Sequence, residues 1–71
     1  MNKAKVIKSA KDFVNTEKSK ASNFMLEILI DNSKPFVNHW INEIALYHTT
    51  VVKLFESELS VRQLVDTKAT K

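Results

Sequence analysis

Glycine is absent from all 71 residues of this chain. Because glycine makes up about 7% of an ordinary sequence, its absence from a chain of this length is informative. Two-residue β-hairpin turns, phosphate-binding loops and dinucleotide-binding loops all depend on glycine. The sequence therefore argues against a β-rich fold and a nucleotide-binding α/β fold. It favours helices joined by turns that Asp, Asn, Ser and Pro can form.

The length predicts a single small helical domain over residues 1–71. The chain has no cysteine and only two histidines, so neither a disulfide nor a self-contained structural zinc site can stabilise it. A domain of this size buries only about 60% of the surface of its unfolded chain. Its stability must therefore come from helix packing or from association with another chain.

Residues 34–57 carry the strongest pattern in the sequence and predict one long helix. At steps of about 100° per residue, nearly all of its large apolar side chains fall on one half of a helical wheel, with polar side chains opposite. Ser33 can cap its start, and Pro35 suits its first turn. β-branched side chains at 49–52 lower the helix propensity and leave a strand there as the weaker alternative.

The first third of the chain carries a second apolar stripe, and its two halves are in phase. This phase predicts one helix over about residues 3–31. Glu17 lies in the middle of the stripe and leaves two interpretations open. One is a break near 16–19, with Thr16 or Ser19 capping a second helix. The other is a polar side chain that sets the register of a buried seam.

The end of the chain predicts a short helix over about residues 60–67. Ser60 and Gln63 have the spacing of a capping box, and Leu59 and Leu64 have the spacing of a hydrophobic staple. The two long helices are joined by a short connection, so they should run antiparallel. The sequence thus predicts an all-α fold: a helical hairpin of two long antiparallel helices plus a short C-terminal helix that folds back on it.

The apolar surface of this hairpin is broader than the chain can cover, because residues 24–30 are apolar nearly all round. We therefore expect a second copy of the chain or a larger protein to complete the bundle. Aromatic side chains on such a surface are typical interface anchors. The residues expected at the interface are Phe24, Leu26, Ile30, Phe36, Trp40, Ile44, Tyr47, His48, Val51 and Phe55.

The net charge of +3 is unevenly distributed, because residues 1–20 carry +4 and the remainder carries −1. The simplest interpretation of the lysines is a solvated helix surface. Contact with the phosphates of a nucleic acid is the functional alternative, and an anionic membrane surface is a weaker one. The residues that share this basic face are Lys5, Lys8, Lys11, Asn15 and Lys18.

The sequence predicts no catalytic residues, no metal site and no cofactor. His39 and His48 are nine residues apart, so on one helix they point in opposite directions and cannot share a metal. No nucleophile, base and orienting group recur at helical spacing. No run of 18 apolar residues and no secretory signal pattern occurs in the sequence, so we expect an intracellular, cytoplasmic protein without a transmembrane segment.

These observations predict a small non-enzymatic helical module for protein–protein interaction. It would form a homodimer, or act as an accessory or inhibitory subunit that docks on a larger protein. The alternative is a dimeric nucleic-acid-binding regulator that uses the lysine-rich face of the first helix.

Overall fold

The computed structural model describes residues 2–69, with side chains through residue 64. Its helices are α1 (Lys3–Lys18), α2 (Asn23–Ser33) and α3 (Asn42–Ala69), with a 3-10 turn, η1 (Lys34–Phe36), between α2 and α3. No strand occurs within the described residues. The predicted all-α fold is confirmed.

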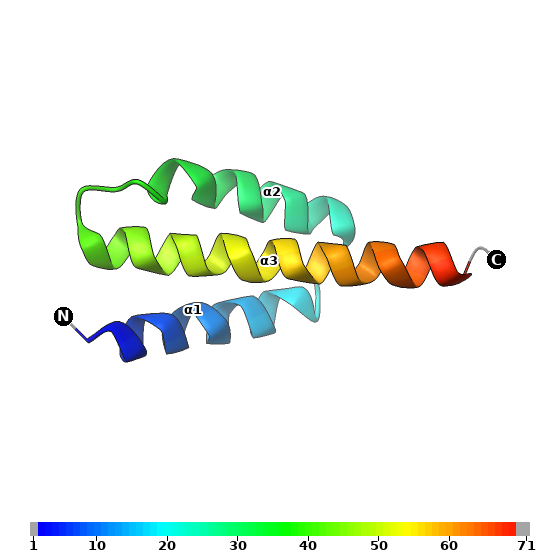
Figure 1. The fold of residues 1–71 in the computed structure, drawn as a ribbon, viewed down its shortest axis with the longest axis horizontal. Helices are drawn as coiled ribbons and strands as arrows, with labels where there is room; N and C mark the ends of the chain where they lie inside the picture. Colours follow the sequence, from blue (N-terminus) through cyan, green and yellow to red (C-terminus); the bar gives the residue numbers. More distant parts are fainter. Residues whose placement is uncertain (1, 70–71) are drawn as a thin grey trace.

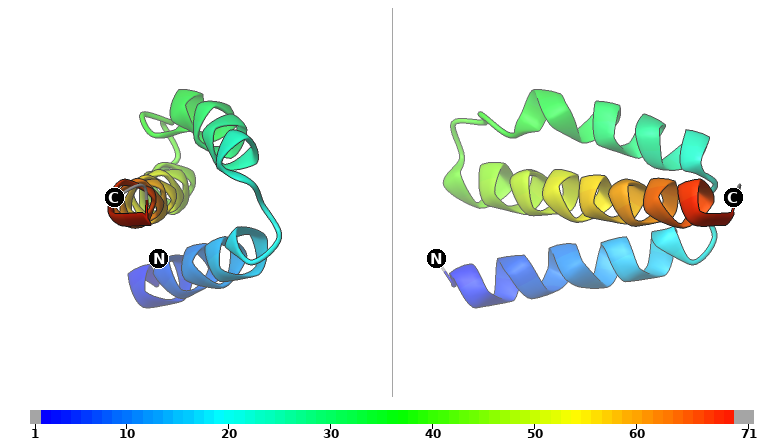
Figure 2. Two further views of the ribbon diagram at one scale, coloured as in Figure 1. Left: turned by 90° about the vertical axis from the view of Figure 1, so that its right-hand side faces the viewer. Right: turned by 45° about the vertical axis from the view of Figure 1, so that its right-hand side comes forward.

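The longest helix, α3, lies between the two shorter helices and packs against both of them (Figure 1). α1 and α3 run in the same direction, and α2 runs in the opposite direction. Seen along the helices, α1 and α2 lie on two sides of α3 and splay apart (Figure 2). The predicted hairpin of two long helices is therefore wrong. The chain forms three helices, and α2 and α3 pack as the antiparallel hairpin.

The expectation of one helix over 3–31 is wrong, and the alternative of a break is correct. The break lies at residues 19–22, a little later than the expected 16–19. The apolar stripe stays in phase across it because α1 and α2 both bury their stripes against α3. An in-phase stripe therefore marks a shared packing partner and not an unbroken helix.

The turn between α1 and α2 is stabilised by hydroxyl groups. The Ser22 hydroxyl oxygen accepts a hydrogen bond from the Met25 amide at 3.2 Å, so Ser22, and neither Thr16 nor Ser19, caps α2. The Ser19 hydroxyl instead donates to the Thr16 carbonyl oxygen at 2.9 Å. Two serines thus satisfy backbone groups at the two helix ends without a glycine.

Glu17 does not set the register of a buried seam. Its partly exposed carboxylate lies 3.6 Å from the Lys20 ammonium nitrogen in the last turn of α1. The Glu17 carbonyl oxygen accepts the amide of Ala21 at 2.9 Å, which closes the turn after the helix. Glu17 therefore marks the end of α1.

The helix expected over 34–57 begins later than predicted. Pro35 lies in η1, and the chain then reverses through residues 37–41 before α3 starts. In this reversal the Nδ1 atom of His39 accepts a hydrogen bond from the Ile41 amide at 3.0 Å. The Ile41 carbonyl oxygen accepts the first helical bond of α3, from Ala45 at 3.1 Å. A side chain two residues earlier thus offers the backbone an alternative to helical bonding.

α3 continues without interruption to Ala69, so the predicted separate helix over 60–67 is also wrong. No glycine or proline follows position 35, so nothing in the backbone forces a break there. The β-branched stretch is helical too, and the Thr50 hydroxyl donates to the Leu46 carbonyl oxygen at 2.9 Å. The last turns of α3 extend beyond the turn between α1 and α2 (Figure 1), and they do not fold back.

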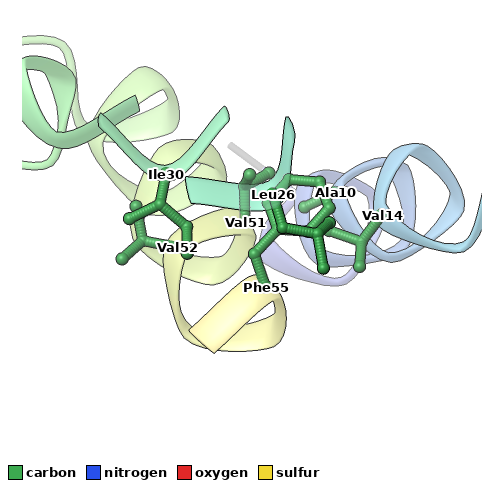
Figure 3. Close-up of a cluster of buried hydrophobic side chains, with 7 residues drawn as sticks. All are labelled: Ala10, Val14, Leu26, Ile30, Val51, Val52 and Phe55. Carbon is green, nitrogen blue, oxygen red and sulfur yellow. The ribbon is translucent and has the colours of Figure 1, made fainter. Parts of the chain in front are cut away.

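The core lies where the three helices meet, and each helix contributes to it (Figure 3). Phe55, Leu26 and Val51 have no exposed surface. The buried apolar residues are Ala10, Val14, Leu26, Ile30, Val51, Val52 and Phe55. Because α3 supplies three of them, it organises the packing of both shorter helices.

Candidate interaction surface

The ten residues expected at an interface divide into three groups. Leu26, Ile30, Val51 and Phe55 lie in the core described above, so they are not available to a partner. This part of the expectation is wrong, because α1 and α2 cover the side of α3 that the hairpin would have left open. Sequence periodicity identified these side chains as apolar but could not say whether the cover comes from the same chain.

Three further residues, Ile44, Tyr47 and His48, are half-buried on the first turns of α3. Phe24, Phe36 and Trp40 are exposed, as an interface requires, with exposed fractions of 68%, 42% and 84%. Trp40 is the most exposed large apolar residue of the described chain. Of the expected surface, three aromatic residues are exposed, whereas most of the aliphatic residues are buried.

Three exposed apolar residues were missed, namely Met25, Val61 and Leu64. The sequence pattern assigned Val61 and Leu64 to a helix that folds back, together with Val65, whose side chain lies outside the described residues. Leu64 is instead 63% exposed. The start of α2 and the last turns of α3 lie at one end of the molecule, whereas η1 and residues 37–41 lie at the other end, where α1 also starts (Figure 1). The exposed apolar residues therefore gather at both ends.

Four nearly parallel rings form a stack at the η1 end. His39 lies 5.7 Å from Trp40 at 22°, and Phe36 lies 6.3 Å from His39 at 27°. His48 lies 4.8 Å from Phe36 at 28°. We call Trp40, His39, Phe36 and His48 the ring stack. It joins η1 and the reversal that follows to the second turn of α3.

The ring stack is continuous with the core. Tyr47 contacts His48 edge-on, with ring centroids 5.3 Å apart. Phe13 of α1 lies 6.4 Å from Tyr47 and 6.0 Å from the buried Phe55. Such tilted and edge-on pairs are favourable ring geometries. The exposed indole at one end of the stack is thus connected through rings to the centre of the fold.

Burial shifts the acid–base properties of two of these rings. Burial lowers the pKa of His48, and the neighbouring His39 lowers it further. The Nδ1 atom of His48 is buried and has no hydrogen-bond partner. Burial raises the pKa of the Tyr47 phenol. Both shifts favour the neutral forms of these rings.

Arg62, the one arginine of the chain, was not singled out by the sequence pattern. Its guanidinium donates to the carbonyl oxygens of Lys18 and Ala21, each at 2.9 Å. It also donates to the Asn23 side chain at 3.0 Å and to Glu58 at 2.9 Å. Arg62 therefore attaches α3 to the turn between α1 and α2. The i, i+4 spacing of Glu58 and Arg62 is the one sequence signal that could have indicated it.

The basic face lies along α1. Lys5, Lys8, Lys11 and Asn15 are exposed, and Lys18 is half-buried. Lys11, Asn15 and Lys18 also line a groove between α1 and α3, together with Val14, Leu54, Ser57, Glu58 and Val61. The ion pairs found within residues 2–64 involve none of the four lysines of this face. The structure thus keeps the expected face together.

The opposite flank of α3 carries an acidic groove. It lies between α2 and α3, and its lining combines three carboxylates and one ammonium group with apolar side chains. The residues that line it are Phe24, Glu27, Ile28, Ile30, Asp31, Lys34, Glu56 and Leu59. The two flanks of α3 therefore differ in charge.

Among the described residues, no three His, Asp or Glu side chains come close enough together to hold a metal ion. No described helix has both the length and the apolar composition that a membrane crossing needs. Comparisons with protein-family models, curated proteins and solved structures give no match to this chain.

Proposed function

We propose that this chain is a small non-enzymatic interaction module, and that its partner is a second copy of itself. The observation that carries the proposal is Trp40, whose indole is 84% exposed yet is held in the ring stack. A tryptophan held in place by stacking loses little conformational freedom on binding, and tryptophan is enriched among residues that dominate binding energy.

The surface area of the chain supports association. The accessible surface is 5163 Å², whereas a compact monomer of 8.2 kDa exposes about 4500 Å². The radius of gyration is 13.3 Å, against about 11 Å for a compact domain of this length. The chain therefore exposes more surface than a compact monomer does, as a helical bundle that lacks a partner would.

We propose that the two copies lie antiparallel. The exposed apolar residues gather at two ends of a molecule 48 Å long. In a two-fold symmetric pair, the Trp40 end of one copy reaches the Leu64 end of the other only when the copies lie antiparallel. This arrangement would cover both apolar ends at once. A larger protein that docks on the same residues, with this chain as an accessory or inhibitory subunit, is the alternative.

Sedimentation analysis over a wide concentration range tests this proposal. We expect a concentration-dependent dimer, and we expect Trp40→Ala and Leu64→Ala each to raise its dissociation constant about 30-fold or more. Lys53→Ala, which alters an exposed residue of the same helix, is the matched control and should leave the constant within about twofold. A folded monomer at every concentration would overturn the dimer and leave the larger partner as the occupant.

A second function is supported by the basic face alone. Lys5, Lys8 and Lys11 are exposed on one side of α1, as phosphate contacts require. The acidic groove would keep a nucleic acid away from the other flank of α3. If the chain binds nucleic acid, replacing these three lysines by glutamine should weaken binding about equally for all sequences and reduce its salt dependence. Unchanged binding in that variant would exclude this use of the face.

A further inference from the structure

We infer that the ring stack is an acid-sensitive latch: protonation of His39 and His48 breaks the stack and loosens the reversal between α2 and α3. The latch joins Phe36 of η1 to His39 and Trp40 of the reversal, and all three to His48 of α3. Two of its four rings are imidazoles, which change charge near neutral pH.

Protonation of His39 removes a hydrogen bond. Its Nδ1 atom accepts from the Ile41 amide at 3.0 Å, so that nitrogen carries a lone pair and the ring proton is on Nε2. In the imidazolium form both nitrogens are donors, and the bond to Ile41 cannot persist. This bond holds the backbone just before the first turn of α3.

Protonation of His48 creates a buried donor without an acceptor. Its Nδ1 atom is buried and makes no hydrogen bond. When the ring is neutral with its proton on Nε2, Nδ1 leaves only a lone pair unsatisfied. When the ring is charged, Nδ1 carries an N–H group. If this group is not solvated, a buried donor without an acceptor destabilises the closed stack. Opening the stack is the movement that admits water to this atom.

No described carboxylate lies within ion-pair distance of either imidazole. Both imidazoles contact the phenyl ring of Phe36, and burial and the neighbouring His39 lower the pKa of His48. Tyr47, whose phenol contacts His48 edge-on, is neutral in this range and does not balance a cation. Glu43, in the first turn of α3, forms no ion pair with either histidine within the described residues.

Two neutral replacements cannot be protonated, and each keeps one contact of the latch. His39→Asn removes a ring but keeps an acceptor for the Ile41 amide, and His48→Phe keeps the ring against Phe36. Asn at position 39 can accept the Ile41 amide through its side-chain oxygen in an Asx turn. Phe at position 48 keeps a ring against Phe36 and has no nitrogen to charge. The variants His39→Asn and His48→Phe, singly and together, are therefore matched controls for the wild-type protein.

Amide spectra recorded by NMR between pH 7.5 and pH 5.0 test the latch. We expect the Ile41 amide and the Trp40 indole N–H to shift together as the pH falls. We also expect the protection of the Ile41 amide against exchange, corrected for its intrinsic rate, to fall about fivefold to tenfold. The amides of Val51 and Phe55 in the core should stay unchanged, which distinguishes local opening from global unfolding.

The double variant should remove both changes, and each single variant should reduce them. Constant Ile41 and Trp40 signals in the wild-type protein would overturn the latch, as would an undiminished transition in the double variant. If the double variant does not fold, the two single variants give the same comparison. The spectra report on the latch in a monomer as well as in a dimer, so its failure is distinguishable from failure of the proposed interface.

Discussion

The Arg62 guanidinium donates a hydrogen bond to the Lys18 carbonyl oxygen at 2.9 Å, although the two residues are 44 positions apart. Lys18 is the last residue of α1, where carbonyl groups have no partner within the helix. A cation at this end also interacts favourably with the helix dipole. Arg62 thus supplies the C-terminal cap of α1 that a glycine provides in many other helices.

Replacing Arg62 by methionine should lower the free energy of unfolding by about 2–3 kcal/mol. The variant loses bonds to Lys18, Ala21 and Asn23, and it leaves carbonyl groups of the turn without a donor. Arg62→Lys should recover only part of this loss, because an ammonium group lacks the planar fork that reaches several acceptors. Urea unfolding measures the effect. The midpoint should fall while the dependence of the free energy of unfolding on urea concentration stays unchanged. Equal stability of the methionine variant and the wild-type protein would show that the cap is unimportant.

Phe55→Ala should remove a large part of the free energy of unfolding, whereas Phe55→Leu should remove less of it. Phe55 has no exposed surface and contacts Phe13 of α1. A buried Phe→Ala change costs about 3–5 kcal/mol. The total stability of a 71-residue domain is about 4–10 kcal/mol. Far-UV circular dichroism across a urea series measures both variants, and a Phe55→Ala protein as stable as the wild-type protein would contradict the described core.

The stability of the protein should fall as the pH drops below about 6.5, the ordinary pKa of histidine. Burial and His39 lower the pKa of His48 in the folded chain. The unfolded chain therefore binds the proton first, and each unit of pKa difference corresponds to about 1.4 kcal/mol. In the His48→Phe variant, the urea concentration at the midpoint of unfolding should depend less on pH between pH 7.5 and pH 5.5. A midpoint that rises on acidification would contradict the sign of this shift.

At alkaline pH the stability should fall again, beginning near pH 10, the ordinary pKa of tyrosine. Burial raises the pKa of Tyr47, so the unfolded chain releases the phenolic proton before the folded chain does. Tyr47→Phe should remove this part of the alkaline loss while it keeps the ring contacts with Phe13 and His48. Thermal unfolding followed between pH 9 and pH 11 compares the two proteins. An identical alkaline decline in both proteins would contradict a contribution from Tyr47.

The sequence by itself determined which segments are helical, which side of each segment is apolar and where the basic face lies. These properties depend on side chains three or four positions apart, and a single sequence displays them directly.

Only the tertiary structure decided where the helices end and which apolar side chains remain free. α1 ends where the Arg62 guanidinium of α3 donates to the carbonyl oxygen of Lys18. α3 starts just after the His39 ring accepts a hydrogen bond from the Ile41 amide. Leu26 and Phe24 are equally apolar in sequence, yet Leu26 packs between three helices and Phe24 faces outward. The physical reason is the same in each case: the deciding partner lies on another element, and local periodicity carries no information about it.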